Sequence, residues 1–198
     1  MDYMEMNQTD LKPSLISLGT ANIGVNNPEE YSYKLLDKYI DKGGNFIDTA
    51  RVYSNWIPGE KNRSERILGE WIKDRKNRDK IILATKGGHP ELDSMNRSRL
   101  TPEEVTSDLD GSLQSLQTDY IDLYYLHRDD PEIPVSEIMD MLHEFVATGK
   151  IRYYGCSNWS VARIRKAQKY AKENNYNGFV ANQMLWNIGV YNMGKLED

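Results

Sequence analysis

The chain has 198 residues, of which 39% are hydrophobic and 28% charged, and its formal net charge is −5. That composition is ordinary for a one-domain globular protein, and the net negative charge argues against nucleic acid or an anionic membrane as the main partner. A single cysteine, Cys156, and an N-terminus without a signal-peptide pattern fit a reducing cytoplasm, and no apolar run is long enough to span a bilayer.

The first elements alternate between strand and helix. Residues 14–18 (SLISL) predict a short apolar strand, and residues 31–40 predict a helix from apolar residues at helical spacing. Residues 46–50 (FIDTA) predict the second strand, and residues 64–73 predict a helix with one apolar face. Residues 81–86 (IILATK), rich in β-branched residues, predict the third strand.

The third helix has the clearest start signal. Thr101 suits the N-cap, Pro102 the first helical position, and Glu104 the acidic position of a capping box. The elements predicted after it are a strand over 120–127 (YIDLYYLH), a helix that ends at Gly149, a strand over 151–158 (IRYYGCSN), a helix over 161–175 and a strand over 178–183 (GFVANQ). Residues 186–198 predict no element.

This alternation indicates βα units with parallel strands and right-handed crossovers. Such units build either a (β/α) barrel or a doubly wound sheet. No G-x-G-x-x-G pattern follows the first predicted strand, so the dinucleotide-binding signature of the doubly wound fold is missing. The sequence therefore favours an α/β barrel.

Each predicted strand after the first is apolar until its end and then presents a polar side chain. These end positions hold Asp48, Lys86, His127, Ser157 with Asn158, and Gln183. In a parallel barrel such ends share one face, where barrel active sites lie. Singly, each has a plainer interpretation: a carboxylate bonded to loop amides, a lysine in solvent, a histidine satisfied in the core, or a Ser-Asn pair that caps the next helix. Together they predict one polar pocket.

Tyr53 follows Asp48 by five residues. Together with three of the strand-end residues, it fits one kind of chemistry. An ammonium favours the ionised form of a nearby phenol, a carboxylate keeps that ammonium charged, and a neutral imidazole can hydrogen-bond a carbonyl oxygen. Asp48, Tyr53, Lys86 and His127 therefore suit proton donation by Tyr53 to a developing oxyanion. No side chain donates hydride, so a nicotinamide cofactor is implied. The three histidines lack metal-ligand spacing, and no metal is expected.

These segments resemble the aldo-keto reductases, from about residue 3 to the end of the chain. The catalytic tetrad of that family matches Asp48 and Tyr53 in FIDTARVY, Lys86 in ATKGG and His127 in YIDLYYLHRDD. The resemblance implies a (β/α)8 TIM barrel that reduces aldehydes or ketones, small-molecule carbonyl substrates, with NADP(H) as the expected cofactor and NAD(H) as the alternative.

The resemblance also implies a cofactor site. The family's carboxamide-binding residues match Ser157, Asn158 and Gln183, and its first-strand turn, which touches the cofactor, resembles Gly19-Thr20-Ala21. The segment KPSLISLGT resembles the family's entry into the first strand after a hairpin across the barrel floor.

Six strands are predicted where the family has eight. The segments that hold the nicotinamide face and the adenosine end in the family are not found in residues 1–198. We therefore expect a single barrel domain over 1–198 that lacks its C-terminal part, a fragment that by itself binds cofactor weakly and reduces carbonyls poorly.

Two other functions remain open. One is a barrel lyase or aldolase that forms a Schiff base on Lys86, and the other is a non-catalytic cofactor-sensing or interaction subunit on the same fold. Trp56 and His89, which follow the second and third predicted strands, are candidates to line a substrate pocket.

Overall fold

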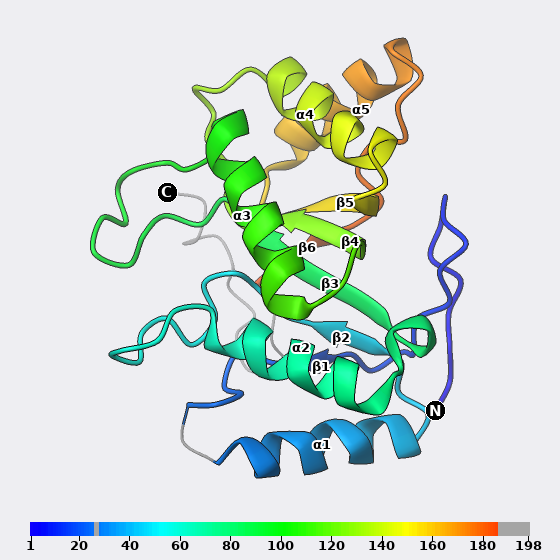
Figure 1. Cartoon of the computed structure of the whole chain (residues 1–198). Helices are drawn as coiled ribbons and strands as arrows, with labels where there is room; N and C mark the ends of the chain where they lie inside the picture. Colours follow the sequence, from blue (N-terminus) through cyan, green and yellow to red (C-terminus); the bar gives the residue numbers. More distant parts are fainter. Residues whose placement is uncertain (26–27, 186–198) are drawn as a thin grey trace.

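The computed structural model describes residues 1–25 and 28–185 and contains one parallel sheet whose strands follow chain order (Figure 1). The strands are β1 (Leu18–Gly19), β2 (Phe46–Asp48), β3 (Ile82–Gly87), β4 (Ile121–Leu126), β5 (Ile151–Ser157) and β6 (Asn182–Gln183). The helices are α1 (Glu29–Asp41), α2 (Arg63–Arg75), α3 (Pro102–Leu116), α4 (Val135–Ala147) and α5 (Val161–Glu173), with a short 3-10 helix, η1 (Arg78–Lys80).

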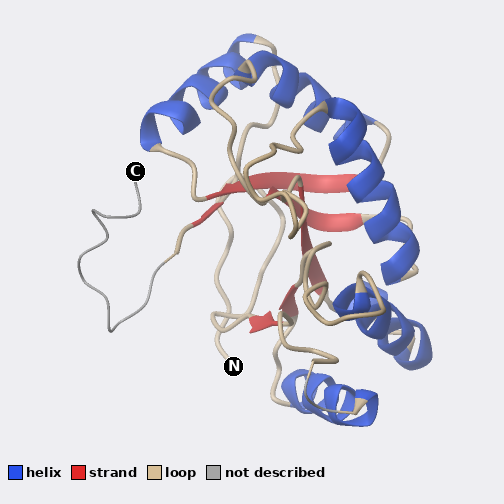
Figure 2. Cartoon of the chain, turned by 90° about the vertical axis from the view of Figure 1, so that its left-hand side faces the viewer, coloured by secondary structure: helices blue, strands red, loops and turns tan. Residues whose placement is uncertain are grey.

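The sheet is curled, and the helices cover its outer face (Figure 2). Each strand pairs in parallel with the next strand along the chain, and within the described residues β1 and β6 are not paired with each other. The six strands form a curled part of a (β/α) barrel, which confirms the predicted fold class. Residues 186–198, in which no element is predicted, lie outside the described residues.

Side chains alternate between the two faces of the sheet, and this alternation decides which residues reach the inside. Ala84 and Leu123 belong to a small apolar cluster on the inner face, whereas Leu83 packs into the larger core between sheet and helices. Lys86 stands two residues after Ala84 on β3 and therefore continues the inner row. Asp48, which bonds to Lys86 from β2, lies on the same side.

The start of α3 confirms Thr101 as the N-cap, but the Glu104 carboxylate bonds to the Thr101 hydroxyl and not to the Thr101 backbone N–H that a full capping box uses. The backbone N–H of Glu104 donates to Thr101 Oγ1 at 3.3 Å, and the Thr101 hydroxyl donates to the Glu104 carboxylate at 3.1 Å. Pro102 is the first helical residue. Val105 and Leu109 are fully buried, so this helix is fixed both by its cap and by its apolar face.

The predicted strand over 14–18 is wrong in extent, because only its last residue and the glycine after it join the sheet. In residues 14–17, side chains rather than a neighbouring strand form hydrogen bonds with the backbone. The Ser14 N–H donates to Asn45 Oδ1 at 2.7 Å, and the Ile16 carbonyl accepts from the Tyr39 hydroxyl at 2.7 Å. These bonds hold the segment beside β2 without a regular ladder.

The last predicted strand, 178–183, is also shorter in the structure, where β6 covers only its final two residues. The side-chain amide of Gln168 binds both backbone groups of Phe179, accepting from its N–H at 2.8 Å and donating to its carbonyl at 2.9 Å. The Gly178 N–H donates to the Tyr154 hydroxyl at 3.1 Å. A side chain of α5 thus takes up bonds that a longer strand would have used.

A hairpin precedes β1 and lies at the amino-terminal ends of the strands, as the resemblance implies. Backbone bonds join Met4 to Pro13 at 3.0 Å and Met6 to Leu11 at 3.1 Å. Met6 packs against the inner apolar cluster, and Arg152 at the start of β5 donates to the carboxylate of Asp10. This hairpin covers the end of the curled sheet opposite the predicted site.

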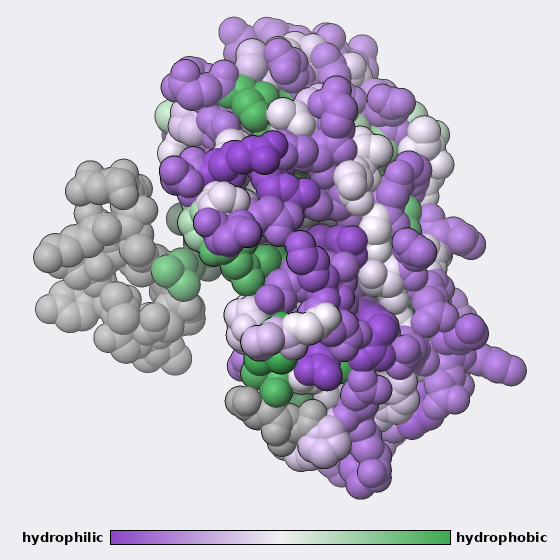
Figure 3. Space-filling model, turned by 60° about the vertical axis from the view of Figure 1, so that its left-hand side comes forward, coloured by the Kyte–Doolittle hydropathy of each residue, from purple (hydrophilic) through white to green (hydrophobic). Residues whose placement is uncertain are grey.

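The surface face in Figure 3 is largely hydrophilic, with apolar side chains in small separate patches. Apolar residues gather instead between the sheet and the helices, where Leu68, Trp71 and Leu109 are fully buried. Among the helices of residues 1–25 and 28–185, none is long and apolar enough to cross a lipid bilayer.

Candidate active site

Lys86 is the centre of a hydrogen-bond cluster at the carboxyl ends of β2 and β3. Its Nζ lies 2.8 and 2.7 Å from the two carboxylate oxygens of Asp48 and 2.9 Å from the carbonyl oxygen of Thr49. The same Nζ lies 3.0 Å from the Tyr53 hydroxyl oxygen. The structure therefore brings together Tyr53 and two of the predicted strand-end residues, Asp48 and Lys86.

This environment decides between interpretations of Lys86 that the sequence leaves open. The side chain is 1% exposed, so it does not keep its ammonium in solvent. A buried charge is tolerated where it is paired and hydrogen-bonded, and here Asp48 supplies both carboxylate oxygens. A Schiff base requires a neutral amine, which this set of acceptors disfavours.

Backbone pairing holds the loop that carries Tyr53 against the strand that carries Lys86. Beyond the end of β2, the Thr49 N–H donates to the Ala84 carbonyl at 2.9 Å and the Arg51 N–H donates to the Lys86 carbonyl at 3.0 Å. The Lys86 Nζ also lies 4.7 Å from the centre of the Tyr53 ring. The phenol is thus fixed by both its backbone and its hydroxyl.

His127 joins this cluster from the end of β4. Its backbone N–H donates to the Gly87 carbonyl at 2.9 Å, and its ring meets the Tyr53 ring edge-on with 5.9 Å between centroids. Burial, followed by the charge of Lys86, lowers the pKa of His127 to about 2, so the imidazole is neutral. Among the described residues, its buried Nδ1 has no hydrogen-bond partner, unlike that of a histidine satisfied in a core.

We expect the lowered pKa of His127 to make folding sensitive to acid. Above pH 6.5, the ordinary pKa of histidine, the ring is neutral in both the unfolded chain and the native protein. Below pH 6.5 the unfolded chain binds a proton at this ring, whereas the native protein does not do so until about pH 2. The free energy of unfolding should therefore fall as the pH drops, by about 1.5 kcal/mol from this group between pH 6.5 and 5. Denaturant titrations of the wild type and His127→Asn at several pH values give the free energy of unfolding as a function of pH. The slope of this curve should be smaller for His127→Asn.

A matched control for this experiment is His143→Asn, since the His143 ring stacks on Tyr176 beside α4, away from the site. This variant should keep the acid sensitivity of the wild type. Burial also lowers the pKa of His89, so the His127 variant should lose only part of the sensitivity. If the free energy of unfolding depended on pH equally in the wild type and in His127→Asn, the lowered pKa of His127 would be contradicted.

The other predicted strand ends, those of β5 and β6, lie side by side. Ser157 pairs with Gln183 in the sheet register, and the Ser157 hydroxyl donates to the Gln183 carbonyl at 3.0 Å. The Asn158 side chain donates to Ser157 Oγ at 3.2 Å and accepts from the Leu185 N–H at 2.7 Å. The cap of α5 is Ser160, which accepts from the Arg163 N–H, so Ser157 and Asn158 are not used as a helix cap.

This donor set fits a carboxamide. A carboxamide offers one acceptor oxygen and two N–H donors. The Asn158 amide keeps an N–H and a lone pair beyond its bonds to Ser157 and Leu185, and the Gln183 side-chain amide has no partner within the described part of the chain. Asn158 is exposed and adopts a positive φ of 58°, which turns the chain at the end of β5.

The turn after β1 is bound to the end of β2. Both the N–H and the hydroxyl of Thr20 donate to the Asp48 carbonyl, at 2.9 and 3.1 Å, and the Ser64 hydroxyl donates to the Thr20 carbonyl at 2.9 Å. Thr20 is fully buried, whereas Ala21 is partly exposed. The polar groups of Thr20 are thus engaged inside the protein, whereas Gly19 and Ala21 on either side of it reach the surface.

Beside the cluster lie His89, which the sequence offered as a candidate to line a pocket, and Arg128, which it did not. His89 lies with its ring centroid 4.8 Å from that of His127, and the guanidinium of Arg128 is 3.4 Å from His89 Nε2. The carbonyl of Thr49 is a further acceptor for Lys86. Trp56, the other candidate for a substrate pocket, is 46% exposed. The only sequence signal for the contact of Arg128 with His89 is that Arg128 directly follows His127.

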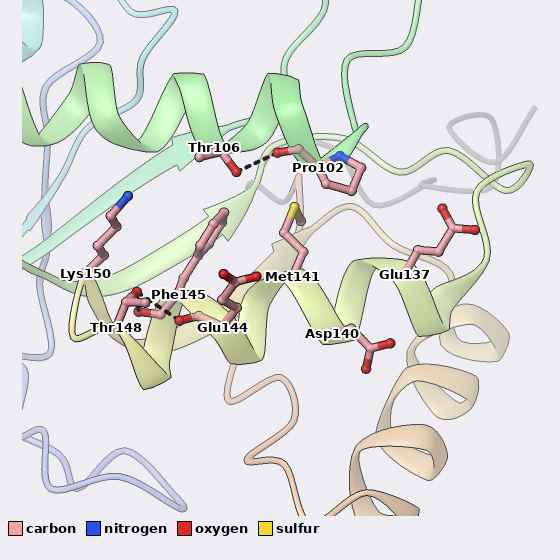
Figure 4. Close-up of a pocket in the computed structure, with 9 residues that line it drawn as sticks. All are labelled: Pro102, Thr106, Glu137, Asp140, Met141, Glu144, Phe145, Thr148 and Lys150. Atoms are coloured by element: carbon pink, nitrogen blue, oxygen red, sulfur yellow. Dashed lines mark hydrogen bonds between the residues drawn. The ribbon is translucent and has the colours of Figure 1, made fainter.

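One pocket lies away from the residues predicted for the site, and another adjoins them. A pocket of about 390 Å³ lies in the groove between α3 and α4, on the outer side of the sheet (Figure 4). Its lining includes Thr106, Met141 and Phe145, and none of the predicted site residues. A pocket of about 200 Å³ between the loops after β2 and β3 reaches His89 and so adjoins the cluster.

Comparison with known proteins identifies the family. The model of the Aldo/keto reductase family matches residues 15–193. The uncharacterized oxidoreductase YrpG of Bacillus subtilis is 35% identical over 192 residues, which are 95% of this chain and 59% of that protein. Norsolorinic acid reductase B of Aspergillus parasiticus is 37% identical over 193 residues, 89% of this chain and 48% of that protein.

A third relative is the aryl-alcohol dehydrogenase (NADP(+)) of Phanerodontia chrysosporium, 34% identical over 177 residues, 83% of this chain and 44% of that protein. The chain spans about half the length of the curated relatives it matches. Because the family model covers nearly the whole chain, from residue 15 to 193, the protein belongs to the aldo/keto reductase family.

Proposed function

We propose that the protein reduces an aldehyde or ketone, or oxidises the corresponding alcohol, with a nicotinamide cofactor and with Tyr53 as the proton donor. The observation that carries this proposal is the 3.0 Å contact between the Lys86 ammonium and the Tyr53 hydroxyl. Both carboxylate oxygens of Asp48 hold that ammonium in place. The names of the relatives, an oxidoreductase, a reductase and a dehydrogenase, support the same class of reaction.

The proposed role of each residue follows from its hydrogen bonds. Because Lys86 donates to the Tyr53 oxygen, the hydrogen of that hydroxyl is left to point at another acceptor, here a carbonyl oxygen. The adjacent ammonium stabilises the phenolate that remains after proton transfer. Neutral His127, beside Tyr53, can donate a hydrogen bond to the same carbonyl oxygen and orient it. Asp48 keeps Lys86 charged and aimed.

The cofactor is proposed to be NADP(H), with NAD(H) as the alternative. When bound, it supplies the hydride that no side chain can donate. Ser157, Asn158 and Gln183 would hold its carboxamide, and the turn at Thr20 and Ala21 would contact it. The name of the aryl-alcohol dehydrogenase includes NADP(+), which supports this preference. A cytoplasmic site of action, supported by the single buried thiol of Cys156, is part of the proposal.

The proposal is tested by following NADPH consumption by the complete protein with aromatic aldehydes, with NADH in a parallel series. We expect aldehyde-dependent consumption of NADPH at a higher kcat/KM than with NADH. Saturable cofactor binding without turnover of any carbonyl tested would favour the non-catalytic subunit instead. That result would overturn the enzymatic proposal.

The Schiff-base alternative has its own test. Borohydride added with a carbonyl compound traps an imine as a stable amine. Because Lys86 is held as an ammonium by Asp48, we expect no adduct at this residue in a peptide mass map. If Lys86 were labelled, and if added substrate reduced that labelling, the lyase would be favoured.

A further inference from the structure

Arg51 lies in the loop between Asp48 and Tyr53, yet its side chain leaves the inner face and enters the layer of helices. Its Nη1 donates to Ser115 Oγ at 3.1 Å and lies 3.6 Å from Glu65 Oε2. The guanidinium therefore sits between α2 and α3, where its side chain is 24% exposed.

Gly111, in the middle of α3, leaves the room that this guanidinium occupies. A Cβ at position 111 would collide with Arg51 Nη2. Glycine is a poor residue for a helix interior, so its presence here is explained by the close approach of Arg51.

Glu65 connects this arginine to the strand of Lys86. Thr85, the residue before Lys86, donates from its hydroxyl to Glu65 Oε1 at 2.6 Å. Glu65 is fully buried, and burial raises its pKa, against the opposing effects of Thr85, Ser112 and Arg51. One carboxylate of α2 thus contacts the loop of Tyr53 through Arg51 and the strand of Lys86 through Thr85.

We propose that Arg51 is a positioning residue that holds Tyr53 against Lys86 by tying the loop after β2 to α2 and α3. This rests on the proposed function, in which Tyr53 must donate a proton to a carbonyl oxygen. The loop is short, so a shift of Arg51 moves the phenol that follows it. Misplacement by about 1 Å of a reacting group can cost about 100-fold in rate.

The test compares Arg51→Met, Arg51→Lys, Gly111→Ala and the double variant Arg51→Met with Gly111→Ala in the complete protein. Arg51→Met should lower kcat by about 10- to 100-fold and leave KM for the carbonyl within about twofold. Arg51→Lys should recover part of kcat. Gly111→Ala, which favours the helix but displaces the guanidinium, should also lower kcat.

The double variant decides whether Gly111 acts through Arg51. Once Arg51 is truncated, the alanine at 111 should cost nothing more, so the double variant should match Arg51→Met. Arg75→Met serves as a matched control, because Arg75 at the end of α2 pairs with Asp37 at 2.8 Å and contacts neither catalytic segment. It should keep wild-type kcat.

A second measurement does not depend on turnover. The ¹³C resonance of the Tyr53 ring carbon that bears the hydroxyl, assigned by its loss in Tyr53→Phe, should move in Arg51→Met and Gly111→Ala and stay in Arg75→Met. If Arg51→Met does not fold, Gly111→Ala alone decides. Wild-type kcat in the Arg51 and Gly111 variants, or an unmoved Tyr53 resonance, would overturn the proposal. An inactive wild type whose Tyr53 resonance still moves would overturn the proposed function and leave this inference standing.

Discussion

Replacing Tyr53 by phenylalanine is expected to lower kcat for carbonyl reduction by about 10²–10⁴-fold and to leave cofactor affinity nearly unchanged. The change removes only the hydroxyl that lies 3.0 Å from Lys86 Nζ. The ring keeps its position, because the loop backbone is held to β3 by the Arg51 N–H. A group that acts on the substrate oxygen in the transition state contributes to kcat more than to binding.

Steady-state kinetics and cofactor titration by protein fluorescence measure the two quantities separately. Tyr170→Phe is a suitable control, since its hydroxyl donates to Asp140 on the outer helices and lies far from the cluster. Retention of most of the wild-type kcat by Tyr53→Phe would remove Tyr53 from the role of proton donor.

Replacing Lys86 by methionine is expected to lower kcat at least as much and also to destabilise the fold. Asp48, which is 7% exposed, would lose the ammonium that compensates its charge. Removing one partner of a buried ion pair typically costs about 3–5 kcal/mol. Asp48→Asn should lower kcat less than Lys86→Met, since Lys86 keeps its bonds to Thr49 and Tyr53.

The double variant Lys86→Met with Asp48→Asn separates catalysis from stability. Neutralising residue 48 should restore much of the free energy of unfolding, measured by denaturant titration, while kcat stays as low as in Lys86→Met. A double variant that recovered activity with stability would show that Lys86 acts only by supporting the fold. An Asp48→Asn variant far less active than Lys86→Met would make Asp48, rather than Lys86, the more important of the two for catalysis.

The sequence by itself determined the fold class and the residues at the strand ends. Alternating strand and helix patterns require parallel βα units, and period-two side-chain alternation puts Asp48 and Lys86 on one face once β2 and β3 pair. The α3 cap was also predictable, since Thr101, Pro102 and Glu104 all lie within one helical turn. These are local properties of the chain.

Only the tertiary structure decided which polar residues are bonded and where two strands are cut short. The contacts of Gln168 with Phe179 and of Tyr39 with Ile16 shorten β6 and β1, and neither pair is close enough in sequence to be read from a local pattern. Glu65 carries a weak signal, since it stands three residues before Leu68 on the buried face of α2. Its partners Arg51 and Thr85 come from other elements, and the side-chain geometry that joins them exists only after the sheet and helices have packed.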